Sequence, residues 1–126
     1  METTAYNLED FIQCCKSNPE NIHVEYDALL NARQQFGLNT KTDLLGFIGN
    51  DGLQDLTYVN TELWRNNPRK EKEILIDSYK FRSNNKRGYI AFMKGIPGNY
   101  MIKSFHLDHD KLTLKDIGNN SGKLLR

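Results

Sequence analysis

Residues 73–107 contain three short runs: Glu-Ile-Leu-Ile-Asp-Ser-Tyr-Lys-Phe (73–81), Gly-Tyr-Ile-Ala-Phe-Met-Lys (88–94) and Tyr-Met-Ile-Lys-Ser-Phe-His-Leu (100–107). The runs are rich in β-branched and aromatic residues, which favour strands. Between them lie residues 82–87 and 95–99, whose polar residues, glycines and proline are typical of turns. The pattern predicts three consecutive antiparallel strands, and the rest of the fold is organised around them.

The turn between the second and third runs sets their predicted pairing. Pro97 presets φ for the second turn position, and Gly98 accepts the positive φ that a type II turn needs at the third. We therefore expect Gly95 and Tyr100 to face each other across this turn.

In this register Tyr89 pairs with His106, and Ala91 pairs with Ser104. One face of the strands then offers polar side chains, while the opposite face is expected to form a core. The expected core residues on these two strands are Ile90, Phe92, Met101 and Phe105. A slip by one residue would place Tyr89 opposite Phe105 and mix the two sets, so the separation favours the first register.

Composition and length indicate one globular domain. The chain has 126 residues, 38% of them hydrophobic and 26% charged. No apolar run approaches the ~20 residues of a membrane span, and residues 1–6 lack the features of a secretory signal. We predict a single domain over residues 1–117, a flexible tail over residues 118–126, and a cytoplasmic protein without a membrane role.

The N-terminal half has helical patterns. Residues 8–16 and 26–36 have apolar residues at helical spacing, and Thr40 is placed to cap a third, short helix. Residues 22–24 form a short extended piece, and residues 56–64 have the pattern of a strand. The predicted fold class is α+β, with three N-terminal helices packed on a four-stranded antiparallel meander sheet.

Charge is divided unequally along the chain. Residues 1–62 carry a net charge of −7 and residues 63–126 carry +8. This asymmetry indicates that the strand-rich half faces an anionic partner such as the phosphates of RNA; the alternative is a set of solvated charges on loops and strand edges. The candidate RNA-binding residues are Arg65, Arg69, Lys70, Lys72, Arg82, Lys86 and Arg87.

The chain lacks the usual signatures of cofactor and metal sites. It has no glycine-rich phosphate loop and no nucleotide-binding fingerprint. Cys14 and Cys15 are adjacent, which suits neither a disulfide nor a zinc site, and we interpret them as reduced thiols. Asp108 and Asp110 flank His109, but at most the two carboxylates could share an ion. We expect no cofactor and no metal.

A metal-independent ribonuclease needs one group that takes the 2′-hydroxyl proton, one that donates to the leaving 5′-oxygen, and cations for the phosphate. An unperturbed histidine titrates near ~6.5, so His106 can transfer protons near neutrality. Tyr89 beside it can orient or relay. Lys80 and Lys103 are candidates for holding the phosphate charge. A purely structural histidine is the alternative interpretation.

Several short segments resemble a known family. They are Ala28-Leu29-Leu30-Asn31-Ala32, Gly37-Leu38, Asp77-x-Tyr79, Tyr89 and Ser104-Phe105. In this order and at similar spacing they resemble the MqsR-type toxins of toxin–antitoxin pairs, which belong to the RelE-like bacterial endoribonucleases. The resemblance implies a RelE-like α+β domain that cleaves mRNA without metal and is held inactive by a cognate antitoxin protein.

The family's functional residues match this chain unevenly. The family tyrosine matches Tyr89, and the lysine that follows the family's Ser-Phe is His106 here. The family's glutamine falls at or beside Ile76, and its lysine on the first strand falls near Tyr58. If His106 is structural, the catalytic residues are to be sought among Tyr58, Tyr79, Lys80 and Lys103.

Two functions are therefore open from the sequence. The first is an endoribonuclease that cleaves single-stranded mRNA by attack of the 2′-hydroxyl. The second is a non-catalytic interaction module whose acidic helical half docks a basic partner.

Overall fold

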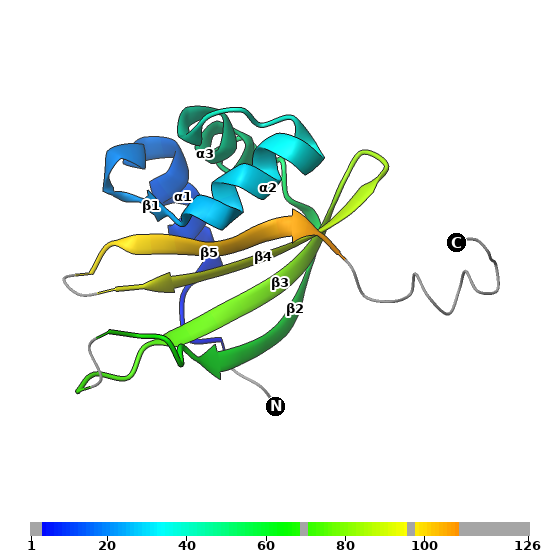
Figure 1. Cartoon of the computed structure of the whole chain (residues 1–126). Helices are drawn as coiled ribbons and strands as arrows, with labels where there is room; N and C mark the ends of the chain where they lie inside the picture. The colour runs from blue at the N-terminus through cyan, green and yellow to red at the C-terminus, as the bar shows by residue number, and fades with distance from the viewer. Residues whose placement is uncertain (1–3, 69–70, 96–97, 109–126) are drawn as a thin grey trace, which may run out of the picture.

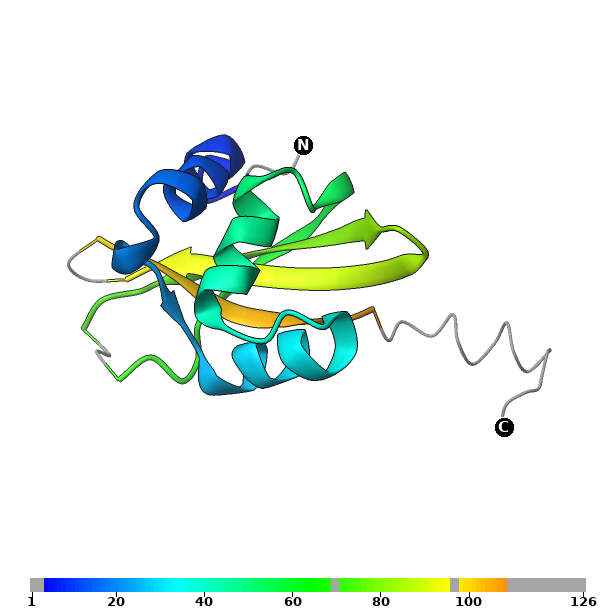
Figure 2. The same cartoon turned by 90° about the horizontal axis from the view of Figure 1, so that it is seen from above.

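Three helices lie over one face of a five-stranded sheet in the computed structural model, which describes residues 4–68, 71–95 and 98–108 (Figure 1, Figure 2). The helices are α1 (Leu8–Ser17), α2 (Tyr26–Phe36) and α3 (Lys41–Gly49), with a short 3₁₀ turn, η1 (Pro19–Asn21), after α1. The strands are β1 (His23–Val24), β2 (Gln54–Leu63), β3 (Leu75–Ser83), β4 (Lys86–Lys94) and β5 (Tyr100–Leu107). Their order across the sheet is β1-β5-β4-β3-β2.

Local capping explains where the helices begin and end, and all three predicted helices are confirmed. The Asn7 side chain accepts a hydrogen bond from the backbone N–H of Asp10 at 2.9 Å, which caps α1. Thr40 caps α3 in the same way through the N–H of Asp43 at 3.0 Å. Gly37 ends α2 in the left-handed conformation, with φ of 71°.

The sheet has one strand more than the sequence predicted. Strands β2 to β5 form the expected antiparallel meander, but β1 pairs with β5 in parallel, with Val24 opposite Ile102. The N–H of Glu25 also donates to the carbonyl of Ile102 at 3.0 Å. The α+β class is therefore confirmed, and the purely antiparallel four-stranded sheet is wrong. The extended piece covers backbone groups of β5 that would otherwise lie at an open edge.

The turn between β3 and β4 is shorter than predicted. Residues 82–87 were expected to be a connection, yet the ladder continues until Ser83 faces Lys86. Only two residues remain in the turn, and Asn84 accepts the positive φ of 55°. As a result Arg82 and Arg87 are strand residues that face each other across the ladder.

The predicted pairing of β4 with β5 is correct at one end and wrong at the other. Tyr89 lies opposite His106 and Ala91 opposite Ser104, as expected. Nearer the turn the register shifts, and Tyr100 faces Lys94 instead of Gly95. The ladder passes from Ser104 to Ile102 with only one step on β4, so Lys103 is an extra residue.

This bulge also changes which residues of β5 reach the core. Tyr100 and Ile102 are buried in it, with exposed fractions of 4% and 0%. Met101 was predicted to be a core residue. It instead lies opposite Met93, on the face away from the helices, and is only half-buried. A bulge shifts the alternation of side chains along a strand, and the turn residues at positions 95–99 do not reveal one.

The core lies between the helices and the sheet. Phe11 of α1 stacks on Phe92 of β4 with ring centroids 3.9 Å apart. Phe81 of β3 lies over Gly88 of β4, where a Cβ would stand 2.2 Å from the phenyl ring. Ile90 and Phe105 complete this face of β4 and β5. The helices therefore cover one face of the sheet, while Tyr89 and His106 lie on the other.

Two further predictions concern membrane spans and the C-terminal part of the chain. Within the described residues, no helix combines the length and apolarity that a bilayer span requires. The expected tail of residues 118–126 lies outside the described residues, as does the end of the predicted domain after residue 108.

Candidate functional site

A row of four side chains crosses the sheet face that carries no helix. Thr57 of β2 lies opposite Lys80 of β3, Lys80 opposite Tyr89 of β4, and Tyr89 opposite His106 of β5. Directly opposed residues project to the same side of a sheet. We call these four residues the polar row. It brings together three of the residues that the sequence singled out for chemistry.

Tyr89 and His106 form the centre of the polar row. Their rings stack with centroids 5.0 Å apart and planes inclined by 20°. The Tyr89 hydroxyl donates to Oγ of Ser78 at 2.9 Å. Ser78 is buried and lies opposite Ala91, one row away. Stacking and hydrogen bonding therefore hold the phenol in one orientation beside the imidazole.

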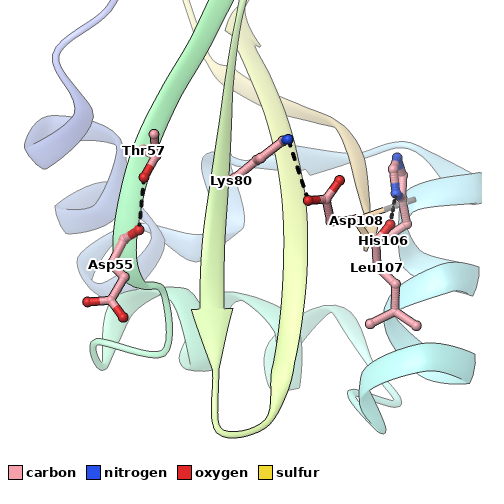
Figure 3. A network of polar contacts seen from close by, with 6 residues as sticks. All are labelled: Asp55, Thr57, Lys80, His106, Leu107 and Asp108. Atoms are coloured by element: carbon pink, nitrogen blue, oxygen red, sulfur yellow. Dashed lines mark hydrogen bonds and ion pairs between the residues drawn. The ribbon is translucent and has the colours of Figure 1, made fainter. Parts of the chain in front are cut away.

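The imidazole of His106 has a defined tautomer when it is neutral. Its Nδ1 lies 2.6 Å from the carbonyl oxygen of Leu107 (Figure 3). A carbonyl can only accept, so Nδ1 carries the hydrogen and Nε2 holds the lone pair of the neutral ring. A hydrogen bond of this kind at one ring nitrogen determines whether the other nitrogen of the neutral ring carries the hydrogen or the lone pair.

Lys80 extends across β4 toward the end of β5. Its Nζ lies 3.6 Å from a carboxylate oxygen of Asp108, as Figure 3 shows. Only 10% of the Asp108 side chain is exposed, against 39% of the Lys80 side chain. The N–H of Asp108 donates to the carbonyl of Arg87 at 2.9 Å, which holds the carboxylate at this end of the ladder. Lys80 is thus a positioned cation next to Tyr89.

A pocket of about 270 Å³ lies beside the polar row, at the end of the sheet near the β3–β4 turn. Its lining includes the cations Lys80, Arg82 and Arg87 and the carboxylates of Asp55 and Asp108. Arg82 Nε lies 3.5 Å from Asp55. The pocket therefore joins two of the predicted RNA-binding arginines to the lysine of the polar row.

Tyr79 does not lie with Tyr89. Neighbouring residues of a strand project to opposite faces, so Lys80 belongs to the polar row while Tyr79 points toward the helices. Only 5% of Tyr79 is exposed, and its ring stacks on Phe92. Burial raises the pKa of its hydroxyl, and the nearby charge of Asp77 adds to this effect. The two tyrosines cannot act on one substrate group from these positions.

Tyr58, the fallback candidate, lies on the same covered side as Tyr79. The two rings meet edge to face with centroids 5.7 Å apart. The Tyr58 hydroxyl is hydrogen-bonded to Thr61, which donates to the buried carboxylate of Asp77. Asp77 also accepts the backbone N–H groups of residues 5 and 6, at 3.0 and 2.9 Å. This network fastens the N-terminal segment to the sheet.

The remaining predicted cations are dispersed. Lys103 is the bulge residue of β5, two positions before Phe105. Lys86 points to the helical side, where its Nζ donates to the carbonyl of Gln35 at 2.5 Å. Arg65 and Lys72 line a separate pocket in the β2–β3 connection, together with Trp64. Arg69 and Lys70 lie outside the described residues.

Sequence reasoning missed Ser78 and Asp108 as parts of this site. Ser78 precedes Lys80 by two residues and so shares its face, which alternation alone could have indicated. The contact of Asp108 with Lys80 joins residues 28 positions apart and depends on the order of the strands. No local signal in the sequence marks it.

The possible metal ligands and the two cysteines take no part in the polar row. Among the residues that the structure describes, no group of three or more His, Cys, Asp or Glu side chains is placed to hold a metal ion. Asp110, which the sequence raised as a possible ligand together with Asp108, lies outside that part of the chain. Cys14 and Cys15 are free thiols, and Cys15 is buried in the core.

The chain was compared with protein-family models, curated proteins and solved structures. None of these comparisons gave a match.

Proposed function

We propose that this chain is a metal-independent endoribonuclease that cleaves single-stranded mRNA, and that it acts as the toxin of a toxin–antitoxin pair. The observation that carries the proposal is the polar row, in which Lys80, Tyr89 and His106 stand side by side on the face without helices. An acid–base group, an orienting phenol and a cation are the groups that RNA cleavage by the 2′-hydroxyl requires.

In the proposed reaction, Nε2 of His106 takes the proton of the 2′-hydroxyl. The 2′-oxygen attacks the phosphorus, and the bond from phosphorus to the 5′-oxygen breaks. The ammonium of Lys80 stabilises the charge on the phosphate oxygens and donates a proton to the 5′-oxygen. The products are a 2′,3′-cyclic phosphate and a 5′-hydroxyl. Tyr89 keeps the imidazole oriented through the ring stack.

The toxin role rests on the resemblance to the MqsR-type family, and a cytoplasmic location agrees with mRNA as the proposed substrate. A single-stranded substrate fits the uncovered sheet, because an open face can receive unpaired bases while cations at its end hold the backbone. An antitoxin that covers the polar row would block the access of RNA to it.

The direct test is incubation of the purified chain with a labelled single-stranded RNA in the presence of a chelator, followed by analysis of the product ends. We expect cyclic-phosphate and 5′-hydroxyl ends from the wild type and a large loss of product with His106→Ala. Expression of the chain without an antitoxin should slow growth of the host, and expression of the His106→Ala variant should not. If the wild type yields no product with or without divalent metal, the proposal fails and the interaction module becomes the better interpretation.

A further inference from the structure

Two arginines face each other directly beside the polar row. Arg82 of β3 is the ladder partner of Arg87 of β4, so both side chains project to the face that carries no helix. Like charges in directly opposed positions destabilise a pair of strands. Such a pair is favourable when an anion lies between the two guanidinium groups.

Among the described residues, Asp55 supplies part of this anion. Asp55 lies 3.5 Å from Arg82, but 75% of its side chain and 55% of the Arg82 side chain are exposed. An ion pair this exposed is weak and is readily exchanged. Asp55 also sits at an irregularity of β2 with φ of 52°, a left-handed conformation. Its carboxylate therefore reaches Arg82 from a strained position on the edge strand.

Asp108, the other carboxylate of the pocket, is differently placed. Its side chain is 10% exposed and contacts Lys80 of the polar row. Because only a tenth of its side chain is exposed and its backbone N–H is bound to Arg87, Asp108 is part of the sheet structure. Asp55 is thus the carboxylate that an incoming anion can replace.

We infer that Arg82 and Arg87 form a clamp for one phosphate of a single-stranded RNA, and that Asp55 occupies the clamp when RNA is absent. The inference rests on the proposed function, because it concerns the same sheet face. Two guanidinium forks can bind the oxygens of one phosphodiester. The clamp lies two residues along β3 from Lys80, or roughly 6.8 Å. This distance matches one step of an extended RNA backbone, so the clamp holds the phosphate next to the cleaved one.

The test uses a single-stranded oligonucleotide with 2′-O-methyl groups, which binds but cannot be cleaved. Dissociation constants are measured over a range of salt concentrations for the full chain and four variants: Arg82→Gln, Arg87→Gln, Asp55→Asn and Arg33→Gln. Arg33 lies on α2, where its side chain donates to the carbonyl of Asn39, and serves as the matched arginine control. Circular dichroism confirms that each variant is folded.

We expect Arg82→Gln and Arg87→Gln each to weaken binding about tenfold at low salt and to reduce the salt slope by about one. Asp55→Asn should tighten binding, because it removes the internal competitor. Arg33→Gln should leave binding unchanged. If both clamp variants keep the affinity and the salt slope of the wild type, the clamp inference is wrong.

The same protein preparations separate this inference from the proposed function. If the wild type cleaves the unmodified RNA but the clamp variants bind RNA as the wild type does, the clamp is contradicted and the proposed ribonuclease activity stands. If the variants show the expected changes in binding but the wild type cleaves no RNA, the clamp is supported and the proposed ribonuclease activity is contradicted.

Discussion

Tyr89 lies directly opposite His106, and their rings stack 5.0 Å apart on the sheet face that the helices leave uncovered. Their neighbours Ile90 and Phe105 point the other way and are fully buried in the core. The same two strands therefore anchor the domain with one set of side chains and present the stacked tyrosine and histidine with the other.

The first prediction concerns the pH dependence of RNA cleavage. His106→Ala should lower the rate by on the order of 10²–10⁴-fold, since a general acid–base group typically contributes this much. The pH–rate profile of the wild type should have a limb that the variant lacks, because the variant has no imidazole at this position. His23→Ala is the matched control, because His23 is exposed on β1. Full activity of His106→Ala would make this histidine structural.

A second prediction separates the ring of Tyr89 from its hydroxyl. Tyr89→Phe keeps the stack on His106 and loses only the hydrogen bond to Ser78. We expect a loss of roughly two- to tenfold in the cleavage rate, the value of one ordinary hydrogen bond. Ser78→Ala should have a similar effect if the hydroxyl acts by orientation. A much larger loss in Tyr89→Phe than in Ser78→Ala would instead make the phenol a proton donor.

A third prediction tests the close approach of β3 and β4. A Cβ on Gly88 would stand 2.2 Å from the ring of Phe81, so Gly88→Ala forces the phenyl group to move. Overpacking of this kind typically lowers the free energy of unfolding by about 1–3 kcal/mol, which urea denaturation can measure. At Gly95 the nearest atom would be 3.9 Å away, so Gly95→Ala is the control and should change little. Equal stability of both variants would show that Phe81 can move without cost.

A fourth prediction concerns stability at alkaline pH. Burial raises the pKa of the Cys15 thiol to about 12, with a smaller contribution from Cys14. An unfolded cysteine ionises near ~8.5, so the folded chain retains a proton that the unfolded chain loses. This contribution to stability is complete below about pH 8.5 and declines as the pH rises toward 12. Urea midpoints should therefore fall between pH 8 and pH 9.5.

The variant Cys15→Ala checks the origin of that decline. Below about pH 8.5 it should be less stable than the wild type, because it leaves a cavity, but its midpoint should change less between pH 8 and pH 9.5. Cys14→Ala provides the comparison, since Cys14 is only half-buried. If the wild type and Cys15→Ala decline equally, another group is responsible.

Local patterns determined much of this protein from the sequence alone. The three helices follow from apolar spacing and from the caps at Asn7, Thr40 and Gly37, all of which act within a few residues. The opposition of Tyr89 and His106 follows from strand alternation, which is also local.

Tertiary structure alone decided the features that depend on contacts between distant segments. The parallel pairing of β1 with β5 and the bulge at Lys103 arise from how strand backbones meet, and the periodicity of a single strand does not encode them. The ion pair of Lys80 with Asp108 and the facing of Arg82 by Arg87 likewise required the order of the strands and the length of a turn. The polar row could thus be predicted at its centre, while the charges around it were set by the assembled sheet.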